Sequence, residues 1–330
     1  MRRREFITLL VGTVVAWPLS ARAQQPERMR RIGVLKPFLE DDPQEKADHA
    51  ALVQGLGALD WHEGGNLQID WRWTGGDPAL FARYAAELVV LGPEVLLADS
   101  TPSLEALRRQ THTIPIVFVG VVDPIGQGSV ASLAHPGGNI TGFSAFDSLM
   151  AGKWMEMLTQ ITAPVARVSV LFNPTTTPYA GLMLHAIEEA APSFAVAVRA
   201  APVNSDSEVE AMMAGLAREE RGGVLVLPSV FTVTHRDAII ALAARHRLPA
   251  VYSFPVFAAE GGLMSYGVDL ADLHRRSAAY VDRILKGDRP GDLPVQQPTK
   301  FDLVINLKTA KALDITIAPS LLATADEVIE

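Results

Sequence analysis

The sequence contains no cysteine among its 330 residues, and this absence limits what the protein can be. Disulfide bonds, thiolate metal sites and a cysteine nucleophile are excluded. A basic tract is also missing, and the formal net charge is −8, which disfavours binding to nucleic acid or to anionic membranes. Beyond the N-terminal segment no stretch is long and apolar enough to span a bilayer, so we expect no membrane insertion.

The sequence also lacks the usual signatures of catalysis. It has no G-x-S-x-G, P-loop, H-E-x-x-H or G-x-G-x-x-G pattern, so we expect no enzyme, no catalytic residue and no cofactor. The histidines are scattered without the spacing of metal ligands, and we expect no metal site. We interpret them as surface or helix-end residues: His49, His62, His112, His135, His185, His235, His246 and His274.

The N-terminal segment has the order of a signal peptide, which we place at 1–23. Arginines at 2–4 precede a short apolar run, and Ala21-Arg22-Ala23 has the small-x-small form of a cleavage site. The arginine pair indicates the twin-arginine route, with an ordinary Sec signal as the alternative. No cysteine follows for a lipid anchor, so we expect cleavage near Ala23 and a mature protein free in the periplasm. Cleavage removes four arginines and one glutamate, which takes the net charge from −8 to about −11.

Short β-branched runs alternate with longer amphipathic stretches through the rest of the chain. Ile32 to Leu35 is a predicted buried strand, Gln44 to Leu59 is a predicted helix, and the alternation continues to a strand at Leu303 to Ile305. This pattern is typical of parallel sheets with helices on both faces. The length suggests two domains, so we predict an α/β protein with two similar doubly wound parallel-sheet lobes joined by a hinge.

Two similar passages indicate where the lobes divide. "HTIPIVFVG" is followed by "GGNITGFSAFD", and "HRLPAVYSF" is followed by "GGLMSYGVD". An internal duplication and convergent loop chemistry both explain this similarity. We predict a first lobe of 30–140 plus about 265–290 and a second lobe of 141–264 plus about 291–330, with the C-terminal assignment open.

Ligands of open parallel sheets bind beyond the carboxyl ends of the strands, which nominates the loops that follow the predicted strands. Ser100 and Thr101 could cradle a carboxylate or cap the helix that follows. Asp123 could pair with a ligand ammonium or cap its own turn, and Thr175 marks a second polar cradle. Aromatic residues could wall an apolar pocket. The predicted ligand contacts are Phe38, Ser100, Thr101, Asp123, Asn173, Thr175, Tyr179, Ser229, Phe231, Phe254 and Tyr266.

The charge of these loops restricts the ligand further. Lys36 is their main cation, whereas a phosphate ester or another dianion would require arginine in a bidentate role. We therefore favour a zwitterion, a monocarboxylate or a neutral amide.

Several stretches together resemble one family. The most specific are "STPSL" at 100–104, "TIPIVFVGVVDPIGQGSVASL" at 113–133, "PGGNITGFS" at 136–144, "GGLMSYG" at 261–267 and "PSLLATADEVI" at 319–329. The chain is similar to ABC-transporter substrate-binding proteins of the TrpX-like family, which have the type I periplasmic-binding-protein fold. The resemblance implies a ligand held between the lobes, and the characterised branch implies aromatic amino acids or other small organic solutes.

The resemblance implies a periplasmic solute-binding protein that delivers its ligand to an ABC permease and its ATPase. The expected ligand is a small organic solute, such as an amino acid, an aromatic compound or a related carboxylate or amide. We expect a monomer that closes around this small molecule by hinge motion. Two alternatives stay open: a periplasmic sensor that docks a receptor, and a secreted enzyme on a two-lobe scaffold.

Overall fold

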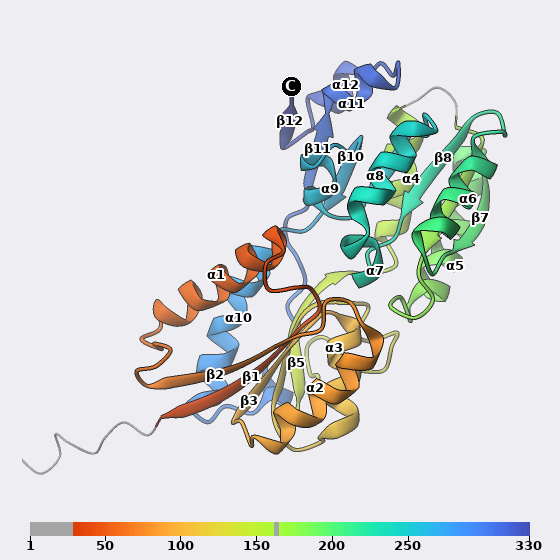
Figure 1. Cartoon of the computed structure of the whole chain (residues 1–330). Coiled ribbons are helices and arrows are strands. Elements are labelled where there is room, and N and C mark those ends of the chain that lie inside the picture. The colour runs from red at the N-terminus through yellow and green to blue at the C-terminus, as the bar shows by residue number, and fades with distance from the viewer. Residues whose placement is uncertain (1–28, 162–164) are drawn as a thin grey trace, which may run out of the picture.

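The structure is a computed structural model that describes residues 29–161 and 165–330. The predicted signal peptide at 1–23 lies outside the described residues. Figure 1 shows two lobes, one mainly orange and yellow and the other green and blue, each with helices packed on its sheet. The predicted pair of α/β lobes is therefore confirmed. None of the helices within the described ranges combines the length and apolarity needed to cross a membrane.

The first lobe is a five-stranded parallel sheet with helices on both faces. Its elements are β1 (Arg30–Lys36), α1 (Pro43–Gly57), β2 (Leu67–Trp73), α2 (Pro78–Val90), β3 (Val95–Asp99), α3 (Thr101–Gln110), β4 (Ile116–Val122), β5 (Ile140–Phe146) and α10 (Leu270–Leu285). The strand order is β2-β1-β3-β4-β5. Helices α1 and α10 pack together on one face, and α2 and α3 cover the other. Because both faces are covered, the central strands are apolar runs, and β3 is buried throughout.

The contact between α1 and α10 depends on a glycine. A Cβ added to Gly55 of α1 would lie 2.5 Å from the carbonyl oxygen of Arg275 and 2.9 Å from the Cβ of Ala278, both on α10. The two helices therefore approach too closely for a larger side chain. Asp42 caps the start of α1, where its Oδ1 accepts a hydrogen bond from the backbone N–H of Gln44 at 2.8 Å.

The second lobe is a seven-stranded sheet of order β12-β11-β10-β9-β8-β6-β7. Its elements are α4 (Met150–Ile161), β6 (Arg167–Phe172), α5 (Ala180–Ala190), η1 (Ala191–Phe194), β7 (Ala197–Pro202), α6 (Asp206–Leu216), β8 (Gly222–Val226), α7 (Val230–Thr234), α8 (Arg236–Arg245), β9 (Ala250–Tyr252), α9 (Pro255–Ala259), β10 (Met264–Gly267), β11 (Asp302–Asn306), α11 (Leu307–Ala312), α12 (Pro319–Leu322) and β12 (Glu327–Ile329). A short helix, η2 (Pro290–Asp292), follows α10 and packs against β5 of the first lobe.

One strand pair of the second lobe departs from the prediction of parallel sheets. β11 pairs antiparallel with β10, with Met264 opposite Ile305. β10 leads toward the first lobe, whereas β11 returns from it after α10, so the two neighbours run in opposite directions. The second sheet is therefore mixed, although its remaining strand pairs are parallel.

The sheets divide the chain slightly later than the boundaries expected from the sequence. β5 pairs with β4, so the first sheet continues through Phe146 and past the expected boundary at 140. β10 pairs with β9 and β11, so the second sheet continues through Gly267 and past the expected boundary at 264. Both strands precede a crossing between the lobes. Strands β11 and β12 lie in the second sheet.

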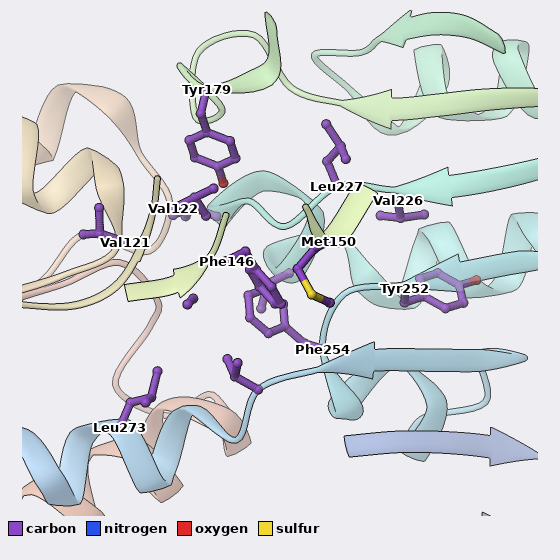
Figure 2. Close-up of a cluster of buried hydrophobic side chains, with 14 of the residues drawn as sticks. Val121, Val122, Phe146, Met150, Tyr179, Val226, Leu227, Tyr252, Phe254 and Leu273 are labelled. Carbon is purple, nitrogen blue, oxygen red and sulfur yellow. The ribbon is translucent and has the colours of Figure 1, made fainter. Parts of the chain in front are cut away.

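Aromatic side chains gather where the chain crosses between the lobes. The ring of Phe146, at the end of β5, lies 5.3 Å from that of Trp154 and 5.5 Å from that of Phe254. Figure 2 shows Phe146, Met150 and Phe254 grouped at this crossing. The indole Nε1 of Trp154 donates a hydrogen bond to the carbonyl oxygen of Tyr266 at 2.8 Å, which ties this crossing to the one after β10.

Candidate ligand-binding site

A small cavity of about 40 Å³ lies between the lobes, at the carboxyl ends of the strands. The first lobe contributes the loops after β1 and β3, the end of β4 and the first residue of α10. The second lobe contributes the loops after β6, β8 and β9. Six of the predicted ligand contacts line it: Phe38, Ser100, Thr101, Tyr179, Ser229 and Phe254.

Three other predicted contacts lie in a neighbouring groove at the rim of the lobes. Asn173, Thr175 and Phe231 line this groove, which shares Phe38 with the cavity. Asn173 Oδ1 accepts hydrogen bonds from the backbone N–H of Thr175 at 3.1 Å and of Thr176 at 2.9 Å. The side chain of Asn173 therefore organises its own turn, and Phe231 stacks on the ring of His235.

The structure does not bring the last two predicted contacts to the cavity. Asp123 Oδ1 accepts a hydrogen bond from the backbone N–H of Gly126 at 2.9 Å, so Asp123 caps its own turn. Tyr266 stacks on Phe301 with ring centroids 5.7 Å apart and lines a surface pocket of the second lobe. The turn-capping alternative for Asp123 is the one that this geometry supports.

The N-terminus of α3 opens onto the cavity. Ser100 precedes it with φ of 83°, and its side chain makes no capping bond to the helix. Ser100 Oγ instead lies 3.3 Å from Ser103 Oγ. Thr101 Oγ1 accepts a hydrogen bond from the backbone N–H of Val122 at 3.3 Å, which ties α3 to the end of β4. Ser100, Thr101 and Pro102 at the start of α3 thus line the cavity, where a helix N-terminus favours negative charge.

The second lobe supplies a mainly apolar wall. Tyr179 is 3% exposed, and its hydroxyl donates a hydrogen bond to the carbonyl oxygen of Pro228. Burial raises the pKa of Tyr179, so the phenol stays neutral. Ser229 forms a capping box with Thr232, which occupies its hydroxyl. The ring of Phe254 is buried against the crossing and completes this wall.

Five ionisable side chains form a buried charge cluster inside the first lobe: Lys36, Glu45, Asp48, Asp99 and His274. Lys36 Nζ lies 2.6 Å from Asp99 Oδ2 and 3.0 Å from Glu45 Oε1. His274 Nε2 lies 3.1 Å from both Lys36 Nζ and Asp99 Oδ2. His274 Nδ1 lies 3.9 Å from Asp48 Oδ1. The cluster joins β1, α1, β3 and α10 beneath the cavity, and Asp99 also lines it.

Burial and neighbouring charges shift these groups in different directions. Burial raises the pKa of Glu45 to about 7 and that of Asp48 to about 6. Burial acts the same way on Asp99, but the charges of Lys36 and His274 outweigh it and hold the pKa well below its usual value. Burial and Lys36 lower the pKa of His274, yet Asp99 and Asp48 outweigh them and raise it. Lys36 stays charged, because its carboxylate neighbours outweigh burial and raise its pKa.

Two expectations from the sequence are wrong at this cluster. His274 is 0% exposed on α10 and not a surface or helix-end residue. Lys36 is also 0% exposed and engaged with carboxylates, so it is not a free cation of the cavity. Asp48, Asp99 and His274 place ligand atoms within 4.8 Å of one another, as at a metal site. The ammonium of Lys36 lies among these atoms and supplies the positive charge there.

Comparisons with known proteins confirm the fold and the resemblance. A conserved domain protein from Vibrio cholerae has 29% sequence identity and a TM-score of 0.84, covering 91% of this chain and 100% of that chain. An ABC domain from Streptococcus pneumoniae in complex with L-Trp has 25% identity and a TM-score of 0.84, covering 91% and 99%. The Tyrosine-binding protein of Clostridioides difficile is 26% identical over 290 residues, which are 88% of this chain and 82% of that protein.

The alternatives of a receptor-docking sensor and of an enzyme are not favoured by these matches. The family described as ABC transporter substrate binding protein matches residues 31–329, almost the whole described chain. Proteins of this kind capture a small molecule for an ABC importer, in agreement with a cavity shared by two lobes. The chain therefore belongs to the ABC transporter substrate binding protein family.

Proposed function

We propose that this chain captures an amino acid, or a related aromatic carboxylate or amide, and delivers it to an ABC permease and its ATPase. The cavity between the lobes carries this proposal, because it joins a polar helix N-terminus to an apolar wall. The printed names of two relatives support the ligand class, since one is a Tyrosine-binding protein and one is in complex with L-Trp. We further propose that it acts as a periplasmic monomer, exported by its signal peptide, without catalysis.

The first turn of α3 is suited to a carboxylate. Ser100 and Thr101 at its start line the cavity, and a helix N-terminus favours negative charge there. Phe38, Tyr179 and Phe254 would enclose the apolar part of the ligand. Neither arginine nor lysine lines the cavity among the described residues, which disfavours a phosphate ester.

A thermal-shift screen of the mature protein, refolded after ligand removal, tests the proposed function. The library holds the amino acids, aromatic carboxylates, their amides and small peptides. A ligand at about 100 times its dissociation constant adds roughly 2.7 kcal/mol to the free energy of unfolding, which gives a clear rise in melting temperature. A library in which no compound shifts the melting temperature would contradict the proposed ligand class.

Ser100→Ala tests the carboxylate cradle more directly. We expect weaker binding of the best ligand and little change in melting temperature of the ligand-free protein. Ser205→Ala is the matched control, because Ser205 caps α6 away from the cavity and accepts a hydrogen bond from the N–H of Glu208. This control should lose about 1 kcal/mol of stability and keep its affinity. Equal affinities of Ser100→Ala and the unaltered protein would refute the cradle.

A further inference from the structure

The two carboxylate oxygens of Asp99 have different surroundings. Oδ2 lies 2.6 Å from Lys36 Nζ and 3.1 Å from His274 Nε2. Within the described part of the chain, no hydrogen bond ends on Oδ1. Asp99 is 4% exposed and lines the cavity between the lobes. Oδ2 is therefore held by side chains of the first lobe, whereas Oδ1 can accept a hydrogen bond from a ligand in the cavity.

Gly120 shows where Oδ1 points. This glycine, near the end of β4, has φ of +72° and lines the cavity together with Leu270. A Cβ added to Gly120 would lie 3.8 Å from Asp99 Oδ1 and 3.5 Å from Leu270 Cδ2. The missing side chain leaves space directly beside Oδ1, on the cavity side of the sheet.

The buried charge cluster keeps Asp99 ionised and in place. Lys36 and His274 hold its pKa well below the usual value, so Oδ1 is an acceptor only. Oδ1 is not among the fully buried atoms without a partner, so water reaches it from the cavity, and a ligand ammonium would replace that water with a charged donor. Lys36 and His274 supply two positive charges against the carboxylates of Glu45, Asp48 and Asp99. Because Asp99 stays ionised, its Oδ1 presents a negative charge to the cavity.

We propose that Asp99 selects ligands that carry an amine, whose ammonium donates to Oδ1. This inference rests on the proposed function, because it assigns one end of the ligand in the same cavity. Asp99 and Ser100 are consecutive at the end of β3, so the acceptor for an ammonium adjoins the α3 N-terminus that suits a carboxylate. Two neighbouring residues would then recognise the two charged ends of an α-amino acid. The chain does not use Asp123 for this purpose, because Asp123 caps its own turn.

Isothermal titration of the refolded mature protein with matched solutes tests this assignment. The pairs are L-tryptophan with 3-(indol-3-yl)propionate, L-tyrosine with 3-(4-hydroxyphenyl)propionate, L-phenylalanine with 3-phenylpropionate, and L-leucine with 4-methylpentanoate. Each pair differs only in the amine. We expect the amine-bearing member of the binding pair to bind roughly tenfold to hundredfold more tightly, as for a hydrogen bond between charged groups.

Asp99→Asn separates recognition from structural support. The amide oxygen of the variant would face Lys36, because an NH₂ group there would meet the ammonium, so the cavity would receive a donor instead of an acceptor. We expect the amine-bearing solute to lose roughly tenfold or more in affinity, while its amine-free partner binds as before. Asp123→Asn is the control, since Asp123 caps its own turn and does not line the cavity. Asp123→Asn should keep the preference for the amine.

The outcomes distinguish this inference from the proposed function. Equal affinities within a binding pair, or an equal loss for both members in Asp99→Asn, would overturn the role of Asp99 and leave a carboxylate carrier. Binding of none of the solutes would overturn the ligand class and the role of Asp99 together. The two solutes of each pair are compared on the unaltered protein, so equal affinities would overturn the inference even if Asp99→Asn does not fold.

Discussion

Arg236 Nη1 of the second lobe lies 2.7 Å from Asp42 Oδ2 of the first lobe. Arg236 is held from its own side by Glu260, whose Oε2 lies 2.7 Å from Arg236 Nε. The arginine is 8% exposed, so water screens these contacts less than it screens a surface pair. This bridge joins the lobes at the groove beside the cavity, and it can form only when they are together.

Asp42→Asn should weaken this bridge without removing the cap of α1, because asparagine caps helices as well as aspartate does. We expect the affinity for the best ligand of the screen to fall about threefold to tenfold, since closing then gains less free energy. Small-angle scattering should show a more extended ligand-free protein. Arg245→Ala breaks an exposed pair with Glu210 on the same lobe and serves as the control. An unchanged affinity of Asp42→Asn would show that the bridge does not favour closure.

Gly76 also lies where the lobes meet, in the turn before α2. Its φ is +80°, and an added Cβ would lie 3.2 Å from Thr234 Cγ2 in the other lobe. Gly76→Ala should lower the free energy of unfolding by about 1 kcal/mol and weaken ligand binding about threefold or more. Gly64→Ala is the control, because Gly64 has a similar φ of +76° but no atom within 4 Å of the added Cβ. If both variants bind the ligand equally well, closure does not need this glycine.

The buried charge cluster should make stability depend on pH. Burial raises the pKa of Glu45 from 4.5 to about 7, so the folded protein holds a proton that the unfolded chain releases in this range. Protonated Glu45 makes its full contribution to the free energy of unfolding below pH 4.5. This contribution is lost as pH rises through about 7, which lowers the free energy of unfolding by up to about 3 kcal/mol. Glu45→Gln should flatten denaturant-derived stability between pH 5 and pH 8. Glu156→Gln, on the surface of α4, should not, and parallel profiles for all three proteins would contradict the assignment.

The hydroxyl of Tyr179 is a further point where stability can be measured. Tyr179→Phe removes the donor to the carbonyl oxygen of Pro228 and leaves that buried acceptor without its partner. We expect a loss of about 1 to 3 kcal/mol in the free energy of unfolding by urea. Tyr84→Phe, on partly exposed α2, should change stability by less than about 0.5 kcal/mol. Equal stabilities of the two variants would mean that water or backbone movement satisfies Pro228.

The two lobes and many of the loops at the cavity could be predicted from the sequence, because both depend on local pattern. Alternating strands and helices imply parallel sheets, and the carboxyl ends of such strands share one edge. Ser100 and Tyr179 reach the cavity for that reason. The direction of β11 could not be predicted in this way, since it depends on the chain's return from the other lobe.

Contacts between distant residues explain what the sequence did not reveal. Lys36 and His274 look like ordinary polar residues in their own segments, and only the packing of β1 against α10 brings them together. Asp99 directly precedes Ser100 in the sequence, but nothing local distinguishes it from Asp123. The difference is that Asp99 is fixed by two buried cations, whereas Asp123 bonds to its own turn.

The close packing of α1 on α10 has a consequence for the order in which the molecule assembles. Gly55 meets Arg275 and Ala278 across more than two hundred positions of the chain. Until α10 has been synthesised, the part of the first sheet that it covers and the side of α1 that packs on it have no cover. Strands β6 to β10 are contiguous in sequence, so the second lobe can gather most of its sheet earlier. The lobe that begins first on the ribosome thus stays incomplete until α10 emerges, after most of the second sheet, and its uncovered surface needs protection from aggregation in the meantime.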